Sequence, residues 1–409
     1  MNVNLYKKTN NNDVWLRKIP YPYKAHMAIC SDLDETYSKQ IYFETMRFLN
    51  SPSNTVMGKG VDLEVGNTIY FKMPEEQFSY YNTDDDGREE IKRHIKSGHI
   101  DCIHSYGDYV ESRSEVESII NELKRDDCRI PVWVDHAIAP SNFGSDRMAG
   151  QGDVKKSNVY HADLSLNNGI EFVWIGRVTS LVGQNTNASL VKIICFNNFF
   201  ASLKTYAKQL LKQLLSFVGN KKYSMHKGNI LLREYKLRDG RNTIEFIRSN
   251  PSSCGVSCND TAEGFYTVLT KCMLDELVRV NGTTIIYSHL GKTAPSRNNY
   301  FSDATINAFK LLSQYYHANT ILVSTTYRLL KYARMLDKIG VTVTEDNDEL
   351  IINISQYNED ISGLSFYVTG NKSIIVKIDN ISTDFSDYME PNGTRNVVVK
   401  PFTKLQYNH

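Results

Sequence analysis

Acidic and histidine residues stand where apolar, strand-like runs of this sequence give way to polar loops. They are Asp32 and Asp34 after 28–30, His104 and Asp108 after 100–103, Asp135 and His136 after 132–134, and His289 after 284–288. Carboxylates and imidazoles are the groups that bind divalent metals and transfer protons in hydrolases. Because the strand C-termini of a parallel α/β barrel open onto one face, these side chains would converge on one metal or substrate. The pattern predicts a hydrolase site.

Asp32 and Asp34 are two positions apart, so on an extended strand they face the same side. One of them can then bind a metal while the other acts as a base. The structural alternative is a helix N-cap or a loop that solvates its own carboxylates. We favour the functional interpretation because an apolar strand leads directly into the pair.

His104 and Asp108 have the i, i+4 spacing that lets both bind one metal if the segment forms a helical turn. A loop histidine bonded to backbone is the alternative for His104. Asp135 can orient the imidazole of His136, which is a candidate metal ligand or a residue that contacts substrate.

His161 and Asp163 alternate along a predicted strand over 159–164 and would share one face, so they are candidate pocket residues. His289 ends a clear strand pattern and is suited to protonate a leaving group, because imidazole titrates near neutral pH.

Strand and helix patterns alternate from about residue 25 to 340, which predicts an α/β barrel with loop insertions over residues 1–340. Residues 61–65 and 68–71 are expected to form a hairpin or a strand extension, and residues 260–280 a long helix with Asp260 or Thr261 as its N-cap. Beyond Gly340, strand-like runs separated by Asn, Asp and Gly predict a small antiparallel β-sandwich over residues 341–409.

The composition of the chain indicates its class of protein and narrows the binding partners that we expect. The 409 residues exceed one hydrophobic core, and 41% hydrophobic with 23% charged residues is typical of a soluble globular protein. The net charge of +1 gives no reason to expect nucleic acid or an anionic membrane as partner. The N-terminus lacks a signal-peptide pattern and no apolar run is long enough for a transmembrane segment, so we expect a cytoplasmic protein. Seven irregularly spaced cysteines indicate reduced thiols.

Three motifs together carry a resemblance to a known family. They are Ser31-Asp32-Leu33-Asp34-Glu35, His104-Ser105-Tyr106-Gly107-Asp108 and Ser288-His289-Leu290. Over about residues 20–340 the chain resembles the polysaccharide deacetylase superfamily, the NodB-like carbohydrate esterases. Within this superfamily, the chain is similar to deacetylases encoded in bacterial surface-polysaccharide gene clusters, which serve capsule or lipopolysaccharide biosynthesis. The resemblance implies an incomplete (β/α)7-type barrel and a divalent metal, most often zinc, held by one Asp and two His.

Carried over to this chain, the resemblance makes Asp32 the general base, Asp34 and His104 metal ligands, and His289 the general acid. The chain departs from the family in the first motif, which is usually Thr-Phe-Asp-Asp-Gly. The opposite assignment, with Asp32 as the metal ligand and Asp34 as the base, therefore stays open. Asp108 stands where the family has its second histidine, and Asp108, His136 and His161 are the candidates for that ligand. The nearest match to the family's Arg-x-Pro segment is Arg129-Ile130-Pro131.

The leading hypothesis is therefore metal-dependent removal of an N-acetyl group from a sugar, with carbohydrate as the partner. A second hypothesis is a metal-free glycoside hydrolase that uses Asp32 with Asp135 or Asp163 as acid and base. A third is a catalytically degenerate barrel that binds glycan, with the C-terminal β-sandwich as an interaction module.

Overall fold

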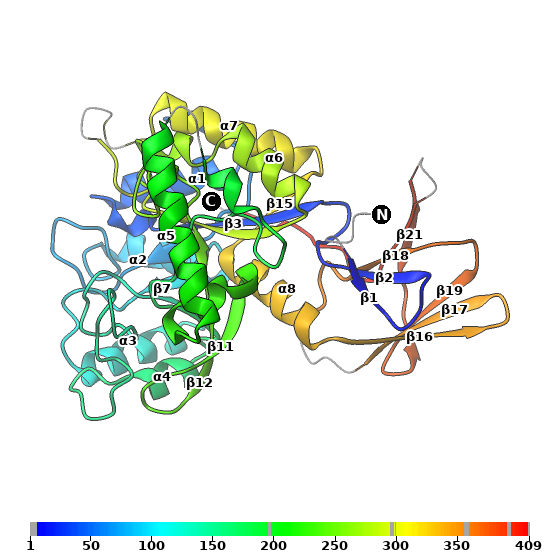
Figure 1. Cartoon of the computed structure of the whole chain (residues 1–409). Helices are drawn as coiled ribbons and strands as arrows, with labels where there is room; N and C mark the ends of the chain where they lie inside the picture. Colours follow the sequence, from blue (N-terminus) through cyan, green and yellow to red (C-terminus); the bar gives the residue numbers. More distant parts are fainter. Residues whose placement is uncertain are drawn as a thin grey trace.

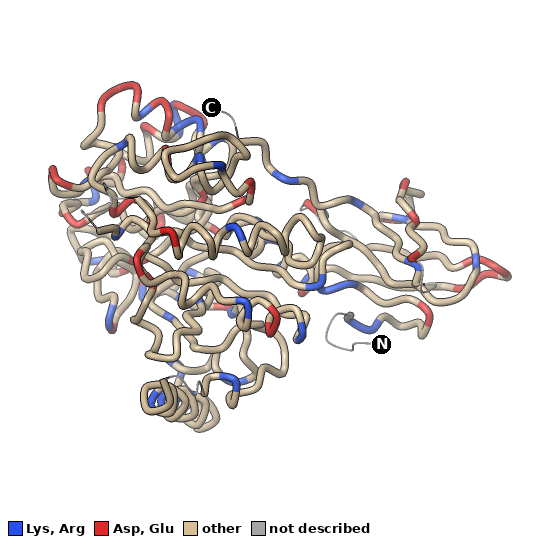
Figure 2. The backbone as a smooth tube through the Cα atoms, turned by 90° about the horizontal axis from the view of Figure 1, so that it is seen from above, with Lys and Arg blue, Asp and Glu red and all other residues tan. Residues whose placement is uncertain are grey.

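A computed structural model of the chain describes residues 6–194, 198–294, 298, 300–355, 360–390 and 394–407. It is a mixed α/β structure, with one large curled sheet surrounded by helices and a separate, elongated β region (Figure 1). Seen from above, the β region projects away from the sheet-and-helix part (Figure 2). The predicted α/β class and the separate β-rich region are confirmed at this level.

The large sheet curls into a half-barrel whose strand order departs from the order along the chain. Its path is β10 (Val178–Thr179), β13 (Arg248–Ser249), β14 (Thr283–Ser288), β3 (Ala25–Ser31), β6 (Asn67–Ile69), β7 (Ile100–His104), β8 (Val132–Val134), β9 (Phe172–Trp174), β12 (Asn242–Phe246) and β11 (Leu232–Lys236). β15 (Ile321–Val323) pairs with the first half of β3, whose last residue pairs with β6. All these pairs are parallel except β11 with β12, so the strand ends that precede the candidate residues share one edge.

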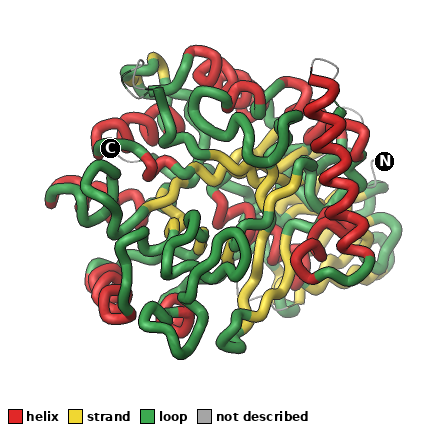
Figure 3. The backbone as a smooth tube through the Cα atoms, turned by 60° about the vertical axis from the view of Figure 1, so that its left-hand side comes forward, coloured by secondary structure: helices red, strands yellow, loops and turns green. Residues whose placement is uncertain are grey.

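Helices lie around the strands (Figure 3). They are α1 (Lys39–Asn50), α2 (Asp85–Lys96), α3 (Arg113–Arg125), α4 (Ala162–Asn167), α5 (Phe199–Phe217), α6 (Lys271–Arg279), α7 (Asp303–His317) and α8 (Thr326–Lys338). α3 begins with a capping box between Ser112 and Glu115, which satisfies two backbone donors that the first turn leaves free.

The central strand β3 is buried at all seven positions, as expected for a parallel strand covered on both faces. Met27 and Ile29 belong to the core cluster that includes α1, α2 and α7. Their neighbours Ala28 and Cys30 point to the opposite face, where they join a second cluster with Val134 and Trp174. The half-barrel is therefore filled on both sides of its sheet.

The β region is a sandwich of two sheets. One contains β1 (Tyr6–Lys8), β2 (Val14–Arg17), β18 (Ser365–Val368), β22 (Arg395–Val398) and β21 (Ser386–Met389), and the other β16 (Gly340–Asp346), β17 (Glu349–Ser355), β19 (Ser373–Ile378) and β20 (Ile381–Ser382). Leu16 and Phe366 of the first sheet share a core cluster with Leu350 and Val376 of the second. The prediction of a purely antiparallel sandwich is wrong in one pair, because β17 and β19 run parallel over six residues.

Both ends of the chain cross the predicted boundary at residue 340. β2 pairs with β18, which places an N-terminal strand in the C-terminal sandwich. Conversely, the C-terminal tail returns to the half-barrel, where Leu405 donates its backbone N–H to Glu64 at 2.8 Å (Figure 1). Dividing the chain at a single position therefore does not account for the N-terminal strands or the tail.

Two predicted elements differ from the structure. Residues 61–65 and 68–71 do not form a hairpin, because Asn67–Ile69 forms the parallel strand β6 between β3 and β7. The short hairpin here lies earlier, between β4 (Asn54–Thr55) and β5 (Gly58–Lys59). The predicted helix over 260–280 is instead a short 3₁₀ turn, η6 (Phe265–Thr267), followed by α6. Within the residues described, every helix falls short of the combined length and apolar character that a membrane crossing requires.

Candidate active site

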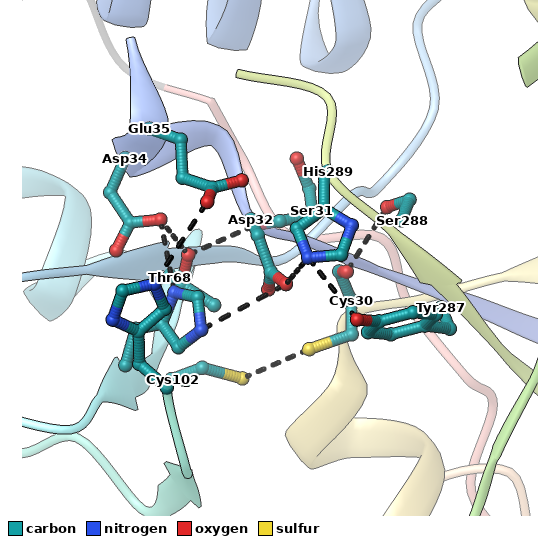
Figure 4. A network of polar contacts seen from close by, with 12 residues as sticks. Cys30, Ser31, Asp32, Asp34, Glu35, Thr68, Cys102, Tyr287, Ser288 and His289 are labelled. Atoms are coloured by element: carbon teal, nitrogen blue, oxygen red, sulfur yellow. Dashed lines mark hydrogen bonds and ion pairs between the residues drawn. The ribbon is translucent and has the colours of Figure 1, made fainter. Parts of the chain in front are cut away.

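The candidate site lies at the C-terminal edge of the half-barrel, where β14, β3, β7 and β8 end, with β6 between β3 and β7. Asp32 and Asp34 follow β3, His104 is the last residue of β7, and His289 follows β14. His136 lies two residues beyond β8. Figure 4 shows the Asp32 carboxylate and the His289 ring directed toward one another, with Asp34 on the far side beside Thr68.

His104 lies between the two aspartates at the centre of this cluster. Its Nδ1 is 3.4 Å from Asp34 Oδ1, and its Nε2 is 3.9 Å from Asp32 Oδ2. The ring stacks on Tyr70 with centroids 4.7 Å apart, which fixes its plane. Burial lowers the pKa of His104 well below its ordinary value, so the imidazole is neutral and keeps a lone pair available.

Asp34 is fully buried and accepts a hydrogen bond from the hydroxyl of Thr68. Burial raises the pKa of Asp34 to about 7, although the Thr68 hydrogen bond opposes the shift. Its Oδ2 has no hydrogen-bond partner among the described residues, and the same holds for Asp32 Oδ1 and Glu35 Oε2. Three carboxylate oxygens at the site thus have no hydrogen-bond partner within the described part of the chain.

Asp32 is held by an arginine from a distant part of the chain. Arg248 on β13 is fully buried, and its Nη1 donates to Asp32 Oδ2 at 3.4 Å. The guanidinium lies over the Trp174 ring, 4.1 Å from its centroid, and 5.6 Å from that of Tyr287. A buried cation with aromatic walls compensates the buried carboxylate of Asp32.

His289 forms an acid–imidazole pair with Asp260. The His289 Nδ1 lies 3.0 Å from Asp260 Oδ2, so Nε2 is directed toward Asp32 Oδ2 at 3.8 Å and the Tyr287 hydroxyl at 3.2 Å. Burial lowers the pKa of His289, but the hydrogen bond to Asp260 and the charge of Asp32 outweigh it and raise the pKa above its ordinary value. This imidazole can therefore carry a proton near neutral pH.

A second group of charges lies beside this cluster. Glu35 Oε1 accepts a hydrogen bond from Lys292 Nζ at 2.9 Å and lies 4.0 Å from His136 Nε2. The other nitrogen of His136, Nδ1, is 2.9 Å from Asp108 Oδ1. The rings of His136 and His104 meet edge to face at 4.8 Å, so the two groups are in contact.

The predicted metal ligands are only partly brought together. Asp34 and His104 are adjacent, and a carboxylate with an unpartnered oxygen beside a neutral imidazole is chemically suited to a divalent ion. Asp108 engages His136 instead. Among the described residues, no group of three His, Cys, Asp or Glu side chains is spaced to hold a metal ion.

Asp135 does not belong to the candidate site. Its Oδ1 accepts the Trp133 indole N–H at 2.7 Å and the Phe143 backbone N–H at 2.9 Å, while Oδ2 accepts the Gly144 N–H at 2.7 Å. A carboxylate with these three donors holds the loop after β8 in place. The prediction that Asp135 orients His136 is wrong, because Asp108 fills that role.

His161 and Asp163 also have structural roles. The predicted strand over 159–164 is instead a turn that leads into α4, so the two side chains do not alternate on one face. The His161 nitrogens contact the Ser165 hydroxyl at 2.8 Å and the Ser141 carbonyl at 2.7 Å, and Asp163 forms a two-point ion pair with Arg113. Their prediction as pocket residues or alternative ligands is therefore wrong.

Sequence reasoning missed several members of the site. Asp260 was interpreted as a helix N-cap, but the helix begins only at Lys271, and the carboxylate bonds His289. A charged residue after the apolar pair Phe246-Ile247 is the signal that could have found Arg248. The arginine that resembled the family motif, Arg129, pairs with Glu171 and has no contact with Asp32.

A cavity of about 420 Å³ lies beside the site. Trp174 and Tyr287, which flank Arg248, belong to its wall. Lys208 and Lys212 of α5 line the same cavity. The space next to the candidate acid is therefore bordered by aromatic rings and positive charge.

Comparison of the chain with protein-family models, with curated proteins and with solved structures finds no match.

Proposed function

We propose that this protein is a hydrolase that removes an N-acyl group, such as acetyl, from a sugar, on a deacetylase-like incomplete (β/α) barrel. The observation that carries the proposal is the arrangement of Asp32 and His289. Asp32 Oδ2 is 3.8 Å from His289 Nε2, and each side chain is fixed from behind by its own partner, Arg248 and Asp260. An acyl group placed between them meets a base and an acid.

In this proposal Asp32 takes the proton from an attacking water molecule. The Arg248 guanidinium donates to Asp32 Oδ2 and so orients the carboxylate that accepts this proton. His289, charged through its pair with Asp260, then donates from Nε2 to the leaving amine. Asp260 resembles the residue that orients the imidazole in other acid–base pairs, since it fixes the tautomer and does not face the reacting atoms.

Asp34 and His104 are the residues that we propose to hold a divalent metal, zinc being the first choice. Such an ion would polarise the acyl carbonyl and lower the pKa of a bound water molecule. Both side chains are buried and adjacent, and Asp34 Oδ2 lacks a partner among the described residues. Asp108 and His136 are the neighbours from which a third ligand would come.

The glycoside hydrolase alternative requires a second carboxylate that acts together with Asp32, and the structure engages both predicted candidates elsewhere. Asp135 accepts three hydrogen bonds from its own loop, and Asp163 is bound to Arg113. Neither is therefore available as a partner for Asp32, and the alternative has no observation in its favour.

The test is a screen of N-acetylated amino-sugar oligomers in which released acetate and new reducing ends are both measured. The wild-type chain, purified with and without added zinc, should release acetate without new reducing ends. Asp32→Asn should abolish the release, while Asp163→Asn, a carboxylate outside the site, should retain it. New reducing ends without acetate would show a glycosidase and overturn the proposal. Elemental analysis of wild type and His104→Ala tests the metal separately, with loss of bound metal expected in the variant.

A further inference from the structure

Helix α5 places its apolar residues in water. It runs along the outer face of the molecule, upright in Figure 1 and at the right-hand edge in Figure 3. The most exposed side chains of α5 and of its C-cap are Phe200, Leu211, Leu214, Phe217 and Val218, with exposed fractions of 86%, 56%, 55%, 66% and 79%. At 100° per residue they form one stripe along a helix of nineteen residues, about 28 Å long. An apolar patch of this kind marks an interaction surface.

The opposite face of α5 is polar and is the face that the protein buries. Ser202, Thr205, Gln209 and Ser216 are the buried positions. Thr205 donates to the Ser253 carbonyl at 2.9 Å, and Gln209 Nε2 lies 3.1 Å from His226 Nδ1. Specific polar contacts therefore fix the rotation of the helix and hold the Phe and Leu side chains outward.

The same region is strongly basic. Between Glu171 and Glu234 the sequence has no Asp or Glu, but it has nine Lys and Arg residues. Four of the nine, Arg177, Lys192, Lys222 and Arg233, pair with carboxylates from other segments, so the excess that remains is largely the lysines of α5. Lys204, Lys208 and Lys212 follow at i, i+4 spacing, in a line between the exposed apolar stripe and the buried face. Lys204 and Lys208 are exposed, whereas Lys212 Nζ donates to the Val178 carbonyl at 2.8 Å. Figure 2 views α5 end-on, with blue but no red along it.

We propose that α5 binds to the surface of an anionic lipid bilayer and lies in its interfacial plane. The Phe and Leu stripe would enter the boundary between headgroups and acyl chains, and the exposed Lys204 and Lys208 would contact lipid phosphates. A basic amphipathic helix with aromatic and leucine residues on its apolar face has the composition that interfacial helices require. The proposal goes beyond the proposed function and does not depend on the reaction catalysed.

Charge argues against a second copy of the chain as the occupant of this face. A two-fold symmetric dimer through α5 would bring the exposed Lys204 and Lys208 of two copies together, and α5 itself contains no acidic residue to pair with them. Like charges facing one another oppose association. An anionic membrane satisfies both the apolar stripe and the lysines.

The experiment is co-sedimentation of the full chain with phosphatidylcholine vesicles, with and without phosphatidylglycerol. We expect binding to the anionic vesicles that is about tenfold stronger than to phosphatidylcholine alone and that weakens at high salt. Leu214→Ser/Phe217→Ser should weaken it by about tenfold or more. Lys204→Gln/Lys208→Gln should weaken it on anionic vesicles only.

The matched control is Ile381→Ser/Met389→Ser, which removes two similarly exposed apolar side chains from the sandwich, 72% and 61% exposed. It should leave vesicle binding unchanged, and thermal melting of all variants checks that they fold. Absence of wild-type binding to anionic vesicles would overturn the proposal, as would equal loss in the control. A dimer in solution that Leu214→Ser/Phe217→Ser dissociates would assign the face to a second copy and also overturn it.

Discussion

In most proteins charged groups are exposed and large apolar groups are buried. The C-terminal edge of the half-barrel, called its mouth here, and the outer face of α5 depart from this rule in opposite ways. At the mouth, ionisable side chains such as Asp32, Asp34 and His104 are buried, whereas on α5 Phe200 and Leu211 are exposed. At the mouth, the cost of burial is offset by partners within the chain, of which Arg248 is the clearest. On α5, no described part of the chain packs over these exposed apolar side chains. The first region should therefore be sensitive to internal substitutions, and the second to its external surroundings.

Replacing the candidate acid should produce the largest effect of all. His289→Ala removes the group directed at Asp32 through Nε2, so we expect kcat for deacylation to fall by about 10²- to 10⁴-fold. Steady-state kinetics at neutral pH measures this. Asp260→Asn should give a smaller loss and move the acidic group of the pH profile downward, because the hydrogen bond that raises the pKa of His289 is weakened. An unchanged kcat in His289→Ala would exclude His289 as the acid.

Removing the internal counter-charge should strongly destabilise the fold. Among the described residues, Arg248→Met leaves buried Asp32 with only His104 and His289 within ion-pair distance, and we expect the free energy of unfolding to fall by about 3–5 kcal/mol. Urea unfolding of wild type and variant measures the difference, with Arg248→Lys as the charge-conserving control. A change as small as that of a surface substitution would mean that Asp32 does not need the guanidinium.

Acid should destabilise the structure partly through His161. Burial lowers the pKa of His161 to about 4, from an ordinary 6.5. Between these values the unfolded chain binds a proton that the folded chain excludes, so the free energy of unfolding falls as the pH drops through this window. The shift corresponds to at most about 3 kcal/mol.

His161→Gln should therefore lose less stability than wild type between pH 7 and pH 4, by up to about 3 kcal/mol. Urea unfolding of both proteins at the two pH values gives the comparison. Equal losses in the two proteins would show that His161 is solvated or already charged in the folded state.

The smallest effect is expected where apolar side chains are exposed. Leu214→Ser on α5 should change the free energy of unfolding by less than about 0.5 kcal/mol, because the side chain is already in water. Leu274→Ala on α6, where the side chain is fully buried, should cost about 2–5 kcal/mol. Thermal or urea unfolding measures both. A large loss for Leu214→Ser would mean that the outer face of α5 is packed within the protein.

The sequence identified those residues of the candidate site that directly follow a strand. Asp32, Asp34, His104 and His289 each follow an apolar run, and parallel pairing of β14 with β3 places their ends at one edge. The same local pattern also selected Asp135 and His161, which hold loops together. A carboxylate after a strand is ambiguous because its role depends on which donors the following loop brings to it.

The sequence by itself determined the alternation of strands and helices, the separate β-rich region and the acid and imidazole groups at the strand ends, since these follow from local periodicity. Only the tertiary structure decided that Arg248 holds Asp32, that Asp260 holds His289 and that β2 joins β18. It also decided which face of α5 points outward, because polar contacts of Thr205 and Gln209 with distant segments fix its rotation. Contacts between residues far apart in sequence leave no periodic pattern, so they become visible only when the chain is folded.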